Sequence, residues 1–388
     1  MSSLLIMNVL HDGLKTNILV EDGKFKAFGV PDSAEAEKVF EADGLAIVPA
    51  FYNAHTHAAM SLLRGYADDM PLQTWLQDHI WPYEDKLTAA DIRRGSVMAA
   101  DEMKATGSVF FNDMYFDIEQ TIDVVDKAGM RAAIGITVME SHSKAQEEQK
   151  WGFARSWQDP TGGRIQLCVA PHAVYTVGTE KLKKAAALSR ECGLKIHIHL
   201  SETAQEVTDC IRDYGMTPVR YLDSIGVLGP DVVAAHCVHV DREEWDILAE
   251  RGVTAVHCPC SNMKLGSGRF PYELAIASGT RIALGTDGCS SNNNLDMREE
   301  MKFAALLAKV SGDPTLLPAD TVMDWATRGG AEAFGIDGGV IAPGKVADAI
   351  LIDLSSQKMQ PCHNLVSNWV YSADSSCIRA TVCAGAII

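Results

Sequence analysis

The central part of the chain, from about residue 49 to 342, alternates short apolar runs with longer amphipathic segments. Eight runs rich in Val, Ile and Ala are apolar at most successive positions, which is typical of parallel strands covered on both faces. These runs span residues 45–48, 109–112, 132–138, 165–170, 195–200, 232–236, 253–257 and 281–285. We therefore expect an eight-stranded parallel sheet, in which the run at 45–48 leads into the first strand.

Helical patterns lie between these runs, and a glycine follows each of them closely. They span residues 91–106, 118–128, 179–192, 242–251 and 296–310. A helix that ends at glycine and leads into the next strand is the repeating unit of a parallel α/β fold. Eight such units predict a (β/α)8 TIM barrel over residues 49–342. A doubly wound sheet would show the same alternation of strands and helices, so this pattern alone does not exclude it.

Both ends of the chain have a different pattern, with short strand-like runs and tight turns. Asp-Gly pairs between apolar runs indicate hairpins near the N-terminus. The runs are 4–9, 16–20 and 24–29, then 344–353, 369–371 and 378–383. We expect residues 1–48 and 343–388 to form one small β-sandwich domain beside a catalytic barrel.

Composition excludes several classes of protein. The 388 residues carry a formal charge of −17, which disfavours a nucleic acid or an anionic membrane surface as partner. No apolar run approaches the ~18 residues of a membrane helix, and the first residues lack a signal-peptide pattern. The ten cysteines show no regular framework. A cytoplasmic protein with reduced thiols is expected.

Histidines gather at the ends of the predicted strands. Six of the 12 histidines take such positions, and an aspartate follows the last strand. These residues are His55, His57, His172, His199, His236, His257 and Asp287. Catalytic groups of a barrel meet where its strands end, and imidazole is the commonest metal ligand. We therefore predict a divalent metal site there, with His257 in a structural or substrate-wall role.

Spacing suggests individual roles. His55 and His57 are two residues apart, so an extended chain points both rings to one side, although such a pair alone often marks two ordinary histidines. His199 is nearer its strand end than His197, and we assign His199 as ligand and place His197 deeper in the barrel. Glu202 follows by three residues and could act as general base on a metal-bound water, the alternative being a solvated carboxylate at a helix start.

Longer strings resemble a known group of enzymes. They are Asn53–Met60, Leu63–Asp69, His199–Thr203, Ser261–Leu265, Gly285–Gly288 and Ser291–Met297. With these strings the chain resembles the amidohydrolase superfamily over nearly its whole length. It is most similar to the 5′-methylthioadenosine/S-adenosylhomocysteine deaminase family. Triazine hydrolases and guanine-type deaminases share much of the metal-site pattern.

The resemblance implies a set of site residues. One zinc ion per subunit would be bound by His55, His57, His199 and Asp287, with iron or manganese as alternatives. The catalytic residues would be Glu202 as general base, His236 as hydrogen-bond partner of the metal-bound hydroxide, and Asp287. The nucleoside would be held by Glu84, His172, Glu202, Asp287 and Trp75. From the sequence alone Glu84 is as readily a surface carboxylate, and Trp75 a core tryptophan. A homo-oligomer is expected.

Two features depart from that family. Residues 136–148 contain no arginine, and Arg155 is the first one after them, whereas some family members contact the far end of the substrate with arginines in this region. The sequence therefore leaves open whether a homocysteine carboxylate is recognised. The chain also ends at Ile388, where relatives usually continue for some tens of residues.

The predicted reaction is the hydrolytic deamination of an adenine nucleoside to its inosine analogue and ammonia. The substrate would be 5′-methylthioadenosine, S-adenosylhomocysteine or adenosine, and a carboxylate at Glu84 would disfavour 5′-phosphates. One alternative is a related aminohydrolase or chlorohydrolase of a guanine-type or triazine-type ring, which has no need of Glu84. Another is a metal-binding relative without catalysis, against which the presence of Glu202 argues, because binding alone requires no proton transfer.

Overall fold

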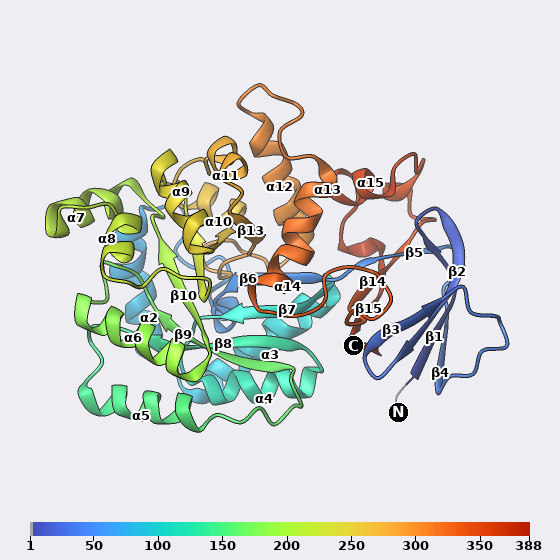
Figure 1. The fold of residues 1–388 in the computed structure, drawn as a ribbon, viewed down its shortest axis with the longest axis horizontal. Coiled ribbons are helices and arrows are strands. Elements are labelled where there is room, and N and C mark those ends of the chain that lie inside the picture. Colours follow the sequence, from blue (N-terminus) through green and yellow to red (C-terminus); the bar gives the residue numbers. More distant parts are fainter. Residues whose placement is uncertain (1–2) are drawn as a thin grey trace.

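Two eight-stranded sheets organise the chain, and the computed structural model describes residues 3–388 (Figure 1). Met1 and Ser2, which the predicted terminal domain includes, lie outside the described residues. One sheet is parallel and lies among helices, and the other is mixed and joins the two ends of the chain. The expected α/β fold is thereby confirmed.

The parallel sheet forms the barrel, and its strands follow each other in chain order. They are β6 (Phe51–Thr56), β7 (Ser108–Asp113), β8 (Arg131–Val138), β9 (Ile165–Pro171), β10 (Lys195–Leu200), β11 (Val232–His236), β12 (Thr254–His257) and β13 (Arg281–Leu284). Asp287, just past β13, donates its backbone N–H to the carbonyl of His55 on β6 at 3.0 Å. The last strand thus returns to the first, which favours the barrel over a doubly wound sheet.

Helices follow the strands and cover the outside of the barrel (Figure 1). They are α3 (Ala89–Ala105), α4 (Ile118–Ala128), α5 (Lys144–Ser156), α6 (Thr179–Cys192), α7 (Ala204–Tyr214), α8 (Pro218–Ser224), α9 (Arg242–Arg251), α10 (Pro259–Lys264), α11 (Tyr272–Ser278), α12 (Met297–Lys309), α13 (Ala319–Asp324) and α14 (Gly330–Ala333). Shorter turns at the strand ends are η1 (Ala58–Leu63), α1 (Leu72–Thr74), η2 (Trp75–Ile80), α2 (Trp81–Glu84) and η3 (Trp325–Gly329). Within the described residues, no helix combines the length and the apolar character needed to cross a membrane.

Local signals explain why several predicted helix ends agree with the structure. Gly129, Gly193 and Gly252 adopt positive φ angles directly after α4, α6 and α9, and they stop each helix at the predicted residue. Thr88 begins α3 with a capping box, in which its side chain and that of Asp91 each accept a backbone N–H.

The second sheet joins the two ends of the chain. Its strands are β1 (Ser3–His11), β2 (Leu14–Glu21), β3 (Lys24–Phe28), β4 (Lys38–Glu41), β5 (Leu45–Pro49), β14 (Ala349–Asp353), β15 (Ile378–Cys383) and β16 (Ala386–Ile387). It curls back on itself, because Phe25 donates its N–H to Lys345 O at 2.9 Å in the segment before β14. Leu4, Ile18 and Leu351 belong to a separate apolar core inside it. The exact division at residues 48/49 and 342/343 stays a prediction.

Two predicted strands are wrong. The run at 45–48 is part of β5 and pairs with β14 in the terminal sheet, so β6 is the first barrel strand and His55 lies inside it. All six residues of β6 are buried, although three of them are polar, and the apolar pattern therefore missed this strand. Residues 369–371 belong to helix α15 (Leu365–Tyr371), which Asn364 caps through the N–H of Ser367.

Candidate active site

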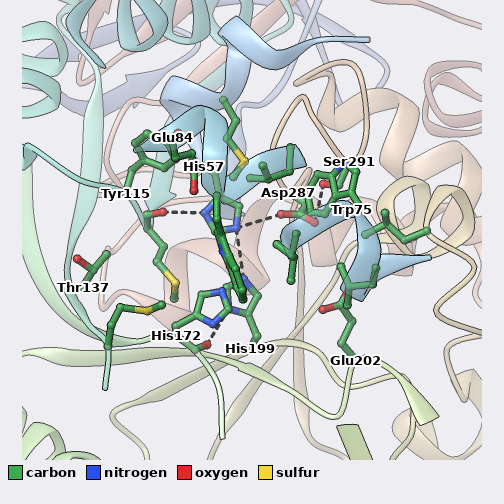
Figure 2. A pocket seen from close by; sticks show the side chains of 18 of the residues that line it. His57, Trp75, Glu84, Tyr115, Thr137, His172, His199, Glu202, Asp287 and Ser291 are labelled. Carbon is green, nitrogen blue, oxygen red and sulfur yellow. Dashed lines mark hydrogen bonds and ion pairs between the residues drawn. The ribbon is translucent and has the colours of Figure 1, made fainter. Parts of the chain in front are cut away.

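A cavity of about 730 Å³, counted to its open mouth, lies at the carboxyl ends of the barrel strands (Figure 2). Aromatic and aliphatic side chains of the segment between β6 and α3 form one wall, and ionisable side chains from the strand ends form the other. The polar lining consists of His57, Glu84, Tyr115, Thr137, His172, Tyr175, His199, Glu202, His236, Asp287 and Ser291. This size and this mixture are typical of small-molecule sites.

Two imidazoles in the wall of the cavity, those of His57 and His199, have their Nε2 atoms 3.3 Å apart. His57 donates from Nδ1 to the carbonyl of Met114 at 2.7 Å, and His199 donates from Nδ1 to the carbonyl of His172 at 2.7 Å. A carbonyl only accepts hydrogen bonds, so each Nδ1 carries a proton. In the neutral rings, both Nε2 atoms therefore direct lone pairs toward the same point.

His55 completes this group from inside the barrel. Its Nδ1 lies 2.8 Å from Nε2 of the buried His197, while its Nε2 is buried without a hydrogen-bond partner. Burial lowers the pKa of His55 to about 4 and the pKa of His197 well below its usual value, so both rings are neutral at pH 7. Close packing fixes this arrangement, since a Cβ on Gly285 would lie 2.9 Å from the backbone of His55.

The carboxylate of Asp287 faces the imidazoles. Its Oδ1 lies 3.2 Å from Nε2 of His55 and 3.3 Å from Nε2 of His57. Its Oδ2 accepts hydrogen bonds from the hydroxyls of Ser261 at 2.6 Å and Ser291 at 2.8 Å. Asp287 adopts a φ of +61°, a strained backbone conformation of the kind that collects at functional sites.

A divalent metal ion fits this donor set. Three imidazole nitrogens and one carboxylate oxygen converge, and the buried Nε2 of His55 forms no hydrogen bond although Oδ1 of Asp287 lies 3.2 Å away. The cluster also attracts positive charge: although burial opposes it, Asp287 raises the pKa of His57 to about 9. His236 belongs to a second group of close donors with His55 and Asp287. Imidazole and carboxylate together suit zinc, iron or manganese.

Glu202 and His236 flank the donor cluster. Oε2 of Glu202 lies 3.9 Å from Nε2 of His236, whose Nδ1 donates to Asn262 Oδ1 at 2.9 Å. Oε1 of Glu202 accepts from the hydroxyl of Ser267 at 3.3 Å. Burial raises the pKa of Glu202, which brings a carboxylate closer to the range of a general base at neutral pH.

A second carboxylate holds Glu202 in place. Glu206 is buried at the start of α7, and it accepts the backbone N–H groups of Ser201 at 2.9 Å and Glu202 at 2.7 Å. Ser201 has a positive φ of 50°. The side chain of Glu206 therefore stabilises the sharp turn after β10. This turn directs Glu202 toward the cavity.

The remaining predicted residues also line the cavity (Figure 2). Burial raises the pKa of Glu84 to about 7, against the influence of the nearby Tyr115 hydroxyl, and its Oε1 is buried without a partner. His172 bonds from Nδ1 to the hydroxyl of Thr176 at 2.8 Å. Trp75 is 5% exposed and contributes an apolar surface.

The structure thus brings every predicted site residue to one place, while their individual roles stay predictions. His197 lies behind His55, deeper in the barrel as expected. His257 lies outside the cavity and bonds from Nε2 to the hydroxyl of Tyr272 at 2.7 Å, which fits a structural role and not a substrate wall.

Several residues that support the site were not predicted from the sequence. They are Ser261 and Ser291 on Asp287, Glu206 beneath Glu202, and Tyr115 beside Glu84. Ser261 and Ser291 each begin one of the family-like strings, which was the only signal that pointed to them.

Comparisons with known proteins identify the family of the chain. The model of the Amidohydrolase family matches residues 46–388. A 5′-deoxyadenosine deaminase of Methanosarcina mazei is 43% identical, with 96% of this chain and 88% of the relative covered. A 5-methylthioadenosine/S-adenosylhomocysteine deaminase of Haloarcula marismortui is 40% identical, with 100% of this chain and 93% of the relative covered.

Solved structures show the same fold. A zinc-bound structure of an adenosine deaminase from Xanthomonas campestris is 34% identical with a TM-score of 0.93, and 99% of this chain and 92% of that chain are covered. The zinc-bound atrazine chlorohydrolase of Arthrobacter aurescens is 22% identical with a TM-score of 0.88, over 99% and 94% of the two chains, and its likeness concerns the fold alone. From the family match and these relatives, the chain belongs to the amidohydrolase family.

Proposed function

We propose that the chain is a zinc-dependent deaminase of adenine nucleosides. The observation that carries this proposal is the pairing of two carboxylates, the buried Glu202 and the half-buried Glu84, across one cavity. Glu202 lies beside the donor cluster, and Glu84 lies on the far side with an unpartnered oxygen (Figure 2). Relatives of 40–43% identity, named as deaminases of 5′-deoxyadenosine and of methylthioadenosine or S-adenosylhomocysteine, support the choice of substrate class.

The metal would be held by His55, His57, His199 and Asp287. Three imidazoles and one carboxylate suit zinc, and a 34% identical structure with bound zinc supports the same ion. When bound, zinc lowers the pKa of water toward ~7 and so makes hydroxide available at neutral pH.

Glu202 would transfer the protons of the reaction. Its carboxylate accepts a proton from the attacking water and delivers it to N1 of the adenine ring as the oxygen adds to C6. His236 presents Nε2 to the same oxygen, because Nδ1 is held by Asn262. Asp287 accepts the next proton from that oxygen and passes it to the amino group, which leaves C6 as ammonia. Ser261 and Ser291 keep the Asp287 carboxylate oriented for this step.

Glu84 would select for the sugar. The side chain is half-buried, and its Oε1, which forms no hydrogen bond in the protein, can accept hydrogen bonds from ribose hydroxyls. In its ionised form, this carboxylate would repel a 5′-phosphate, so nucleosides should be better substrates than nucleotides.

The test is an ammonia-release assay with adenosine, 5′-deoxyadenosine, 5′-methylthioadenosine and AMP. We expect release from the three nucleosides and a much lower kcat/KM for AMP. A preference for AMP would contradict the role of Glu84, and release from none of the four would contradict the proposed function.

A further inference from the structure

Helix α12 contributes a buried carboxyl group that does not line the active-site cavity. Glu300 is fully buried, and its two oxygens accept hydrogen bonds from two different segments. Oε1 accepts from the side-chain amide of Asn292 at 2.6 Å, and Oε2 accepts from the backbone N–H of Cys260 at 3.1 Å. Asn292 lies in the segment after β13, and Cys260 lies in α10, which follows β12. One carboxyl group therefore connects two segments that each follow a barrel strand.

Both contacts lie next to the serines that hold Asp287. Cys260 directly precedes Ser261, and Asn292 directly follows Ser291. The hydroxyls of the two serines donate to the same atom, Oδ2 of the aspartate, at 2.6 and 2.8 Å. Because each serine is joined by a peptide bond to a residue that the buried carboxyl group contacts, this group restrains the backbone of both serines.

The turn that carries Ser291 is anchored at its end. The backbone N–H groups of Ser291 and Asn292 both donate to the carbonyl of Gly288, at 3.1 and 3.0 Å, so the segment forms a compact turn. The side-chain amide of Asn292 donates to the carbonyl of Thr286 at 2.7 Å as well as to Glu300. The first of these contacts closes the turn on itself, and the second joins it to α12. The position of the Ser291 hydroxyl relative to α12 therefore depends on the carboxyl group.

A carboxyl group is unfavourable in this position unless its contacts are needed. Burial raises the pKa of Glu300 to about 8, while the hydrogen bonds from Cys260 and Asn292 favour the charged form and act against this shift. Both oxygens keep a lone pair when the group is protonated, so the two contacts persist in either state. A buried polar group costs free energy that its hydrogen bonds must offset, and an apolar side chain would avoid this cost. The contacts to the two segments are therefore what this carboxyl group contributes.

We propose that Glu300 is a positioning residue of the metal site and acts on Asp287 through Ser261 and Ser291. With Oδ2 held by both hydroxyls, Oδ1 of Asp287 stays directed toward the imidazoles of the donor cluster, 3.2 Å from Nε2 of His55. Glu300 belongs neither to the lining of the cavity nor to the donor cluster, so its effect on a metal ion passes through the serines. The inference rests on the proposed function, because that function supplies the zinc ion that the positioned carboxylate binds.

The test is the zinc dissociation constant of two Glu300 variants, measured by competition with a chelator. Methionine has a similar length and no oxygen, so in Glu300→Met both donors lose their acceptor. We expect this variant to bind zinc about 10- to 100-fold more weakly than the wild type, the usual effect of residues that support metal ligands. Glu300→Gln keeps one oxygen, so its affinity should lie between the two. Glu244→Gln is the matched control and should bind zinc like the wild type, because Glu244 is also buried and accepts the backbone N–H of Asp241 at 2.9 Å, but does not line the cavity.

A double-mutant cycle separates positioning from a general loss of stability. Ser261→Ala combined with Ser291→Ala removes the hydroxyls through which Glu300 acts, so either Glu300 substitution should then change the zinc dissociation constant by less than about twofold. The melting temperature of the metal-free protein should still fall, because the buried contacts of Glu300 are lost in both backgrounds. If Glu300→Met does not fold, Glu300→Gln carries the cycle.

The outcomes distinguish this inference from the proposed function. Wild-type zinc affinity in both Glu300 variants, or an equal fold-loss with and without the two serines, would overturn the inference and leave the proposed function intact. Wild-type protein that binds no zinc and releases no ammonia from 5′-methylthioadenosine would overturn the proposed function itself.

Discussion

Replacement of His197 by leucine is a sharp test of how the donor cluster is held. Nε2 of His197 lies 2.8 Å from Nδ1 of His55, and both rings are fully buried. If Nε2 of His55 binds a metal ion, its Nδ1 carries the proton and His197 is the acceptor that fixes this tautomer. Leucine has a similar size and no acceptor, so the substitution removes the hydrogen bond with little change in packing.

The expected loss follows from this single contact. A buried donor left without its acceptor costs about 1–3 kcal/mol, which corresponds to roughly 5- to 150-fold in a dissociation constant. Residues that orient metal ligands from behind typically change metal affinity by about 10- to 100-fold. We therefore expect His197→Leu to bind zinc about 10- to 100-fold more weakly.

Competition with a chelator measures the zinc dissociation constant of wild type, His197→Leu and His197→Gln. Glutamine places an amide oxygen near the position of Nε2, so His197→Gln should retain more of the affinity than His197→Leu. Thermal unfolding of the metal-free proteins controls for stability. Equal zinc affinity in all three proteins would refute the reasoning that His197 orients His55.

Three further predictions address the carboxylates. Glu202→Gln should keep its metal and lose about 100- to 10,000-fold in kcat, because the proton acceptor is gone; activity within tenfold of wild type would contradict this role. Glu84→Gln should lower kcat/KM for adenosine about tenfold or more, measured by ammonia release, whereas an unchanged value would favour a ring substrate without a sugar. Burial raises the pKa of Glu300 to about 8. At pH values between the pKa of an unfolded glutamate and this value, the native carboxyl holds a proton that the unfolded chain has lost. The free energy of unfolding therefore falls as the pH rises through this interval. Between pH 6 and 8 the wild type should lose about 2 kcal/mol more unfolding free energy than Glu300→Gln in denaturant titrations, and parallel pH profiles would contradict the shift.

Much of the fold could be predicted because its signals are local. Glycines with positive φ end α4, α6 and α9, and the apolar runs match most barrel strands. The apolar pattern did not reveal β6, the first barrel strand, because it contains buried polar residues such as Asn53 and His55. The aromatic run at 369–371 resembled a strand, but a cap at Asn364 made it helical.

Those site residues that lie at the ends of barrel strands could be predicted from the sequence. His57, His199 and Asp287 stand where parallel strands must converge, so their positions followed from the barrel. Ser261 contacts Asp287 from a position 26 residues earlier in the chain, and no spacing rule reveals such a contact.

The assignment as a zinc-dependent nucleoside deaminase is tested most directly by metal content and ammonia release on one preparation. We expect one zinc ion per chain, release of one ammonia for each 5′-methylthioadenosine converted to its inosine analogue, loss of activity on chelation and recovery with zinc. Metal-free protein that deaminates at the same rate would contradict the assignment, and so would zinc-loaded protein that releases no ammonia from any adenine nucleoside.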